Sequence, residues 1–224
     1  MMKKNGFTLA EVLITLAIIG VVATITLPSL MSNTQEQQAV TAFRKAMNTL
    51  NEVAQMNAAV DGFDYGDISS GAAPAAGENT VYNANGILTQ SVWAMMASKA
   101  QVDVTKSGAT GGAIHPGCDG LANIIAFRDG TMLCYAGTTT NGNAQAVINA
   151  AIDTNGIKAP NKVSTCDNAN CSNKAAKNIG DQFRITLYNS MAIPGRVTVD
   201  TNGTFSDVAA SATQNNAARW AMSK

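Results

Sequence analysis

The chain has 224 residues, of which 46% are hydrophobic and 13% charged, and its 15 basic and 15 acidic residues give a formal charge of zero. Charged residues make up about a quarter of an ordinary soluble domain, so uncharged polar and small residues must cover much of this surface. Zero net charge gives no electrostatic reason to expect nucleic acid as a partner. The single histidine, His115, excludes any site that needs two imidazoles.

The first thirty residues are the most informative. Lys3 and Lys4 precede an apolar run from Phe7 to Leu30 that contains no Lys or Arg. As a helix, about 24 residues span roughly 36 Å, which exceeds a bilayer core of about 30 Å. The lysines should stay in the cytoplasm and direct the rest of the chain outward. The run is longer than a secretory signal core and has no clear A-x-A cleavage site, so we expect it to be retained.

Glu11 lies inside this apolar run. A carboxylate there costs roughly 2.5–3.5 kcal/mol on insertion scales, so it needs a polar partner. One explanation is that Glu11 lies near the membrane interface and reaches toward the headgroups. The other is that it pairs with a free amino group created by cleavage just upstream.

Residues 6–14, GFTLAEVLI, resemble the processing site of type IV pilins and type II secretion pseudopilins. The resemblance implies that a prepilin peptidase/methyltransferase cuts between Gly6 and Phe7 and N-methylates Phe7. Glu11 then becomes the fifth residue of the mature chain. The short basic leader and Pro28, near the far end of the apolar run, also fit this family. Other implied partners are pilin-like subunits, an inner-membrane assembly platform, an assembly ATPase and membrane lipid.

In a filament of this kind, Glu11 of one subunit would pair with the Phe7 amine of its neighbour. Buried charges are tolerable when paired and costly when separated, so this pair would set the axial register of the subunits. The small residues Ala17, Gly20 and Ala23 would let helices approach closely. Ordinary packing against lipid explains those small residues about as well.

We divide the chain into a leader peptide (1–6), a transmembrane and filament-core helix (7–30), an amphipathic continuation of that helix (31–60) and a globular head (61–224). Pro28 removes one backbone hydrogen bond and predicts a kink or local melting of the helix. The continuation is expected because apolar residues follow three-and-four spacing at Val40, Phe43, Met47, Leu50 and Ala54.

The head is expected to be a small antiparallel sheet packed on the helix, which gives a pilin-like α+β fold. A short helix is predicted from Val92 to Ala100. Asp129-Gly130, between two apolar segments, predicts a hairpin with a primed turn. Residues 147–152 and 183–188 are typical of strands, and Asn202-Gly203 marks another turn. The tetrapeptide Asp-Thr-Asn-Gly occurs at 153–156 and 200–203, which we interpret as repeated turn chemistry.

Residues 153–161, DTNGIKAPN, followed by residues 180–183, GDQF, resemble the C-terminal region of some pseudopilin-like proteins. Residues 166–177 form an insertion between these halves. The resemblance favours a subunit of a pseudopilus that serves protein secretion, as in type II secretion. The alternatives are a surface type IV pilin for adhesion, motility or DNA uptake, and a monomeric membrane-tethered binding protein.

All four cysteines lie beyond the apolar run, which predicts two disulfides formed in an oxidising compartment. Three pairings are possible. Cys118–Cys134 with Cys166–Cys171 is favoured because each pair closes a local loop. A zinc site competes with this interpretation, but the cysteines lack paired C-x-x-C spacing.

Asp61, Asp64 and Asp67 are candidate calcium ligands, although their spacing does not match an EF-hand and a solvated turn explains them better. The sequence has no phosphate loop, nucleophile elbow or H-E-x-x-H motif. We therefore expect a non-enzymatic protein with no catalytic residues and no cofactor. It should cross the inner membrane once and hold its head in the periplasm or outside the cell, including on a cell-surface filament.

Overall fold

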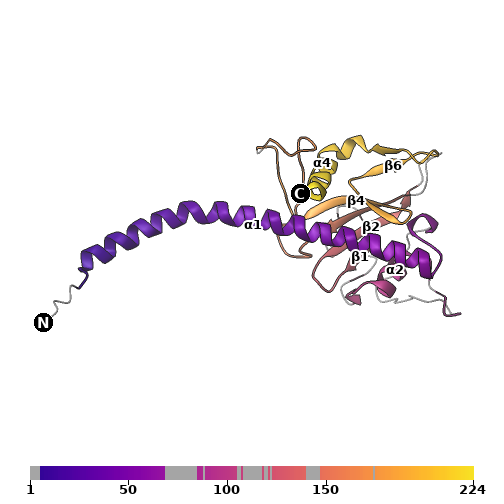
Figure 1. The fold of residues 1–224 in the computed structure, drawn as a ribbon, viewed down its shortest axis with the longest axis horizontal. Coiled ribbons are helices and arrows are strands. Elements are labelled where there is room, and N and C mark those ends of the chain that lie inside the picture. Colours follow the sequence, from indigo (N-terminus) through magenta and orange to yellow (C-terminus); the bar gives the residue numbers. More distant parts are fainter. Residues whose placement is uncertain are drawn as a thin grey trace. The chain divides into compact units, whose positions relative to one another are not determined.

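A computed structural model of the chain describes residues 6–68, 85–87, 89–104, 107, 118, 121, 123–139, 147–173 and 175–224 (Figure 1). The chain divides into two compact units, Met1–Gln38 and Ala39–Lys224. Helix α1, Leu9–Val60, extends through the end of the first unit into the second. The second half of α1 therefore belongs to the same unit as the sheet.

Helix α1 continues through Pro28, so the local melting expected at this position does not occur. A proline removes a single helical hydrogen bond, and the turns on either side keep the helical conformation. Beyond Gln38 the helix becomes amphipathic, as its spacing predicts. Its buried apolar residues are Val40, Phe43, Ala46, Met47, Leu50, Val53 and Ala54.

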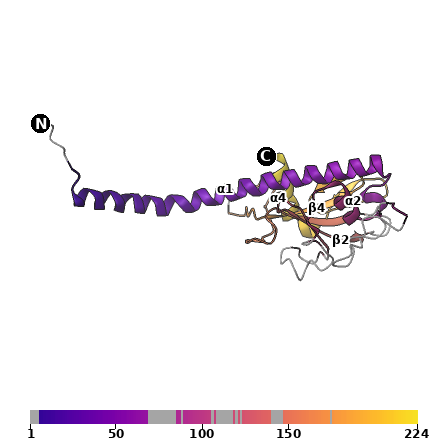
Figure 2. The ribbon, with the colours of Figure 1, turned by 90° about the horizontal axis from the view of Figure 1, so that it is seen from below.

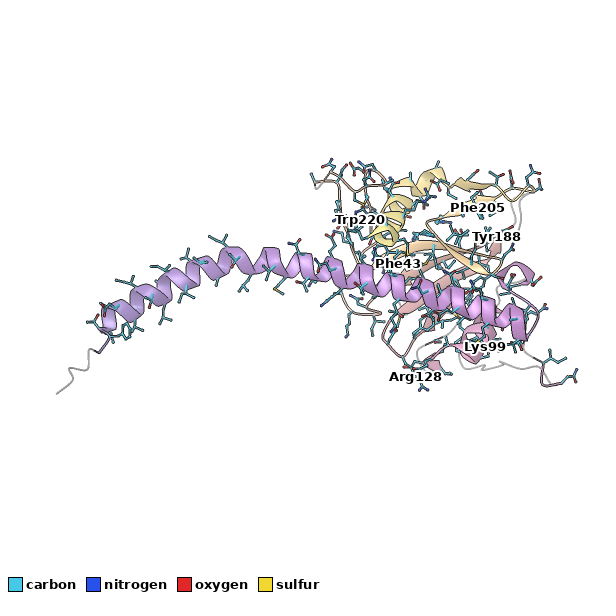
Figure 3. The ribbon with its side chains drawn as sticks, in the orientation of Figure 1. Phe43, Lys99, Arg128, Tyr188, Phe205 and Trp220 are labelled. Carbon is cyan, nitrogen blue, oxygen red and sulfur yellow. A yellow bond between two sulfur atoms is a disulfide. The ribbon has the colours of Figure 1, made fainter. Side chains whose placement is uncertain are left out.

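This buried stripe packs on one face of the head's sheet, and the predicted α+β fold is confirmed. In Figure 2 the second half of α1 lies over the strands. Phe43, labelled in Figure 3, stacks on Phe183 with the ring centroids 4.4 Å apart. Such stacking adds to the stabilisation that burial of both rings supplies.

The C-terminal end of α1 is fixed by a buried asparagine. Asn57 is fully buried, and its Nδ2 donates to the Phe63 carbonyl at 2.7 Å. Gly62 adopts φ 77°, which glycine accommodates without strain, and its N–H donates to the Asn57 carbonyl at 3.2 Å. The following 3-10 helix η1, Tyr65–Asp67, returns to α1 because the Tyr65 hydroxyl donates to the Leu50 carbonyl at 2.9 Å.

The main sheet has five strands in chain order, each antiparallel to its neighbours. They are β1 Asn123–Ala126, β2 Met132–Thr139, β3 Val147–Asp153, β4 Gln182–Tyr188 and β5 Met191–Pro194. A separate two-stranded sheet joins β6, Val197–Val199, to β7, Phe205–Asp207. The strands expected at residues 147–152 and 183–188 are therefore β3 and β4.

The two faces of the main sheet belong to different apolar clusters. The face toward α1 carries Leu133, Ile148, Ile152, Phe183, Ile185 and Leu187. The opposite face carries Met132, Cys134 and Ala151, together with Cys118 from outside the sheet. This division follows from the two-residue alternation of side chains along each strand.

The hairpin predicted at Asp129-Gly130 is present, but its loop differs from the expected primed turn. In the β1–β2 loop, the Gly130 N–H donates to the Phe127 carbonyl, and Gly130 adopts φ 94° while Asp129 keeps a negative φ. A primed type I′ turn needs positive φ at both central residues. The loop is instead a three-residue connection in which glycine takes the left-handed position. The β6–β7 loop has the same form, with Gly203 at φ 80°.

Both edges of the main sheet bond to other parts of the same unit. At β5, the Ala192 N–H donates to Asn51 Oδ1 of α1 at 2.6 Å. At β1, the Ala126 N–H donates to Ser107 Oγ at 2.9 Å, and the Ala126 carbonyl accepts from the Asp103 N–H at 2.7 Å. Backbone groups at a sheet edge that already have hydrogen-bond partners are not available for pairing with a strand of a second sheet.

The remaining helices are α2, Val92–Lys99, the 3-10 helix η3, Ala209–Ser211, and α4, Ala212–Ser223. The predicted helix at 92–100 is thus confirmed as α2. Helix α4 was not anticipated from the sequence. Arg44 of α1 holds it, because Arg44 Nε donates to the Ala221 carbonyl at 2.7 Å.

Replacing Phe43 by alanine tests whether the α1–sheet contact stabilises the head. Loss of a fully buried ring is expected to cost about 3–5 kcal/mol of unfolding free energy. Met56→Ala is the matched control on the same helix, because Met56 is 53% exposed. Denaturant unfolding of the full chain in detergent, followed by the fluorescence of the buried Trp93 and Trp220, measures both. Equal destabilisation by the two variants would contradict the packing described here.

Candidate processing and assembly site

The expected cleavage point lies immediately before α1, in backbone that is neither helix nor strand. The Phe7 side chain is 90% exposed. A Cβ added at Gly6 would meet no atom within 4 Å. The Gly6–Phe7 peptide bond is therefore uncovered by the described residues around it.

Thr8 and Glu11 form a reciprocal cap on the first turn of α1. Glu11 Oε2 accepts a hydrogen bond from the Thr8 backbone N–H at 2.8 Å and another from the Thr8 hydroxyl at 2.9 Å. In return, the Glu11 backbone N–H donates to Thr8 Oγ1 at 3.3 Å. This is a capping box, which satisfies N–H groups at the start of the helix that have no preceding helical carbonyl to bond.

The role of Thr8 was not predicted from the sequence. Its signal was available, because Thr8-Leu9-Ala10-Glu11 is the T-x-x-E pattern of a capping box. Both Thr8 hydrogen bonds to the carboxylate reach Oε2. Among the described residues, nothing bonds to Glu11 Oε1. The carboxylate can therefore accept a further donor while the cap stays in place.

The apolar segment that contains Glu11 is long enough to cross a membrane. Residues Leu9–Leu27 have a mean hydropathy of 2.3, and none of this stretch is buried in the chain. Its hydroxyl groups bond within the helix: Thr15 Oγ1 donates to the Val12 carbonyl at 2.9 Å, and Thr24 Oγ1 to the Val21 carbonyl at 2.8 Å. Such internal satisfaction removes much of the cost of placing threonine in hydrocarbon.

In the head, the structure brings together residues 153–161 and 180–183, the two halves of the segment singled out in the sequence. The Asp181 carboxylate accepts from the backbone N–H groups of Asn161 at 2.8 Å and Lys162 at 2.6 Å. Gln182 Nε2 donates to Asp153 Oδ2 at 2.9 Å. Asp153 and Asp181 are both buried, so these bonds compensate the removal of their carboxylates from water.

Two positions in this region must be glycine, because neighbouring backbone atoms leave no room for a side chain. A Cβ at Gly180 would lie 2.0 Å from the Lys162 carbonyl oxygen, and one at Gly156 would lie 2.7 Å from the Gly130 oxygen. Gly156 also adopts φ 71°. Gly180 therefore lets the two halves approach closely, and Gly156 lets the first half approach the β1–β2 loop.

The structure joins Cys118 to Cys134 and Cys166 to Cys171, which is the pairing that loop length favours. The Cα atoms are 5.6 Å apart in the first pair and 5.1 Å apart in the second. The second bridge closes the start of the insertion at 166–177. The insertion is also tied to α4, because the Cys166 N–H donates to the Thr213 carbonyl at 2.8 Å.

The three candidate calcium ligands do not come together. Asp61 pairs with Lys99 at 2.8 Å. Asp64 caps η1 by accepting from the Gly66 N–H at 2.8 Å, and Asp67 accepts from the Asp64 N–H at 3.0 Å. No group of three His, Cys, Asp or Glu side chains within the described ranges could hold a metal ion. His115 lies outside the described residues.

The capping box predicts a local effect of Thr8→Val. Loss of the N-cap hydroxyl should cost about 1 kcal/mol and speed amide hydrogen exchange in the first turn of α1 roughly fivefold. Thr15→Val is the control, because the Thr15 hydroxyl donates to a carbonyl within the helix and caps nothing. Hydrogen exchange of the Leu9–Glu11 amides is measured in detergent micelles for both variants, and it should be faster in Thr8→Val alone. An equal effect of both variants would contradict the cap.

The close approach at Gly180 predicts that Gly180→Ala destabilises the head by about 1–3 kcal/mol, because the added methyl group must displace backbone. Gly20→Ala is the control, since its added Cβ would meet no atom within 4 Å. Thermal unfolding of both full-length variants in detergent tests this. Unchanged unfolding of Gly180→Ala would mean that the two halves are not packed as described.

Compared with known proteins, the chain shows a match in its N-terminal segment alone. Residues 1–27 match the family model described as the prokaryotic N-terminal methylation motif. No curated protein and no solved structure matches the chain. The match covers Gly6, Phe7, Glu11 and most of the apolar stretch, which are the residues that carry the resemblance to pilins. The chain thus carries the N-terminal methylation motif of type IV pilin-like proteins, ahead of an α+β head.

Proposed function

We propose that this protein is a structural subunit of a type IV-like filament and not an enzyme. In this proposal a prepilin peptidase removes residues 1–6 and N-methylates Phe7. The observation that carries it is the methylation motif, with Glu11 in the first turn of an exposed apolar helix. The uncovered Gly6–Phe7 bond supports access by a membrane peptidase.

Assembly is proposed to pair Glu11 of one subunit with the new Phe7 amine of a neighbour. Glu11 Oε1 would accept the amine while Oε2 keeps its hydrogen bonds to Thr8. A charge pair in a low-dielectric filament core is tolerated only when both partners are present, so it fixes the axial position of each subunit. The exposed Ala17 and Gly20 would permit close contact between neighbouring helices.

Before assembly, the chain is proposed to span the inner membrane once through residues 7–30, with Lys3 and Lys4 on the cytoplasmic side. The head then lies in the periplasm or outside the cell, where disulfides form. An assembly platform, an ATPase and other pilin-like subunits are the partners that this route requires. The exposed apolar side chains of α1 are the surface for lipid and then for neighbouring helices.

Within this class, we propose a secretion pseudopilus, as in type II secretion. Its support is the pseudopilin-like segment, whose two halves are hydrogen-bonded through Asp181 and Gln182 despite the insertion between them. A surface type IV pilin is the alternative use of the same filament. A monomeric membrane-tethered binding protein is the alternative without a filament.

Glu11→Leu separates a filament subunit from a tethered monomer. The variant should insert in the membrane at least as well as the native chain, because it removes a carboxylate from the apolar stretch. Filament assembly should be lost. Glu36→Leu removes a glutamate from the same helix outside that stretch and should leave assembly intact. Sheared filaments are quantified by immunoblot beside the membrane pool of each variant.

Normal filament yield from Glu11→Leu would overturn the proposed pairing. Equal loss in Glu36→Leu would also contradict it, because the effect would then not depend on the apolar position. The secretion role is tested by deleting the gene and measuring exported proteins and surface filaments in parallel. Retained secretion with lost surface filaments would favour the surface pilin.

A further inference from the structure

The loop between β6 and β7 contains an acceptor tripeptide for N-linked glycosylation. Asn202-Gly203-Thr204 has the N-x-S/T pattern, in which the middle residue is not proline. Of the two Asp-Thr-Asn-Gly tetrapeptides in the chain, this is the one followed by threonine. The tripeptide pattern alone is a weak signal, so the case for a glycosylation site depends on the exposure and hydrogen bonding of these residues.

The structure presents Asn202 at the tip of a small hairpin. Asn202 and Thr204 are both exposed. The loop is organised from within by Asp200, whose Oδ1 accepts from the Asn202 N–H at 2.9 Å and from the Thr204 N–H at 2.8 Å. On Asn202 and Thr204 these bonds use only the backbone N–H groups and leave both side chains out. No described residue forms a hydrogen bond with the Asn202 carboxamide. Within the described part of the chain, nothing therefore competes with an enzyme for its nitrogen.

The hairpin is anchored on one side and exposed on the other. Val197 and Val199 of β6 are buried, and the Val197 N–H donates to Thr186 Oγ1 at 3.0 Å. The three residues of β7 are exposed. Phe205, which follows Thr204 and pairs with Val199 at the tip end of the ribbon, packs edge to face on Tyr188 with centroids 5.6 Å apart (Figure 3). This contact holds the end of the ribbon in place, and Asn202 and Thr204 lie beyond it in the exposed loop, where an enzyme can reach them.

Two other asparagines in the chain lack this combination. Asn155 occurs in the first Asp-Thr-Asn-Gly but is followed at the second position by Ile157, and its Oδ1 is buried. Asn170 begins the tripeptide Asn170-Cys171-Ser172, whose central cysteine is in a disulfide. The Ser172 N–H and hydroxyl are both engaged by Asn168.

We propose that Asn202 is a site of N-linked glycosylation, presented by the β6–β7 hairpin to an oligosaccharyltransferase outside the cytoplasm. The donor is an oligosaccharide joined to a polyisoprenyl pyrophosphate. The Asn202 amide nitrogen forms a bond to C1 of the first sugar, the bond between C1 and the pyrophosphate oxygen breaks, and the amide loses one proton. The lipid pyrophosphate is the leaving group. The proposal requires export of the head but not filament assembly.

A glycan at this tip would compensate for the low charge of the protein surface. The chain is 13% charged and has a formal charge of zero, so charge repulsion does little to keep heads apart in solution. A hydrated oligosaccharide on an exposed loop adds polar bulk without disturbing the core.

The test uses the full-length chain in membranes of a bacterium that makes a lipid-linked oligosaccharide and an oligosaccharyltransferase. Intact mass and fragmentation of the residue 197–207 peptide give the occupancy of Asn202. The glycan should appear on Asn202, disappear in Asn202→Gln and Thr204→Ala, and persist in Thr204→Ser, which keeps the hydroxyl. Ile157→Thr completes the tripeptide at Asn155, which should stay unmodified because that loop is packed.

A synthetic peptide of residues 198–206 is treated with the same enzyme and donor. An unmodified Asn202 in the chain beside a modified peptide would overturn the proposal, because the folded hairpin would then exclude the enzyme. Failure of both would overturn it as well, since the tripeptide would not be an acceptor. Modification of Asn155 in Ile157→Thr to the level of Asn202 would show that exposure at the hairpin does not select the site.

Discussion

The constraint on which the rest of the structure depends is an apolar helical stretch that the chain itself does not bury. Leu9–Leu27 has no buried residues within the chain. Each large apolar side chain left in water forgoes about 1.5–3 kcal/mol, so this segment is stabilised by an apolar environment such as a bilayer or packed helices. Glu11 adds a second requirement, because a carboxylate in an apolar environment needs hydrogen-bond donors. Thr8 supplies two of them within the same helix.

The same helix changes its chemistry after Gln38, and the head is built around that change. Phe43, Leu50 and their neighbours supply one side of the core, and the sheet supplies the other. Asn51 bonds to the edge strand β5, and Arg44 bonds to the end of α4. The same helix therefore carries an exposed apolar stretch and part of the core of a folded domain. The sheet edges have hydrogen-bond partners within the head at these positions, whereas the first half of the helix is exposed.

Local features were predictable from the sequence, whereas features made by distant residues were not. Gly6, Phe7 and Glu11 lie within six residues, and the amphipathic spacing of α1 lies within one helix, so both could be inferred directly. Strand β5 was missed because Pro194 and Gly195 resemble a loop. Helix α4 was missed because its place depends on contacts such as Asn215 with the Arg196 backbone, 19 residues away. The Asp181 site likewise joins segments 20 residues apart.

The most direct test of the account is the intact mass and N-terminal fragmentation of the membrane-extracted protein under non-reducing conditions. The account predicts a chain that begins at N-methylated Phe7 and has lost two hydrogens for each of its two disulfides. It would be contradicted by a chain that retains Met1 or Met2 in a host with a prepilin peptidase. Glu11 would then lack the amine with which it is proposed to pair.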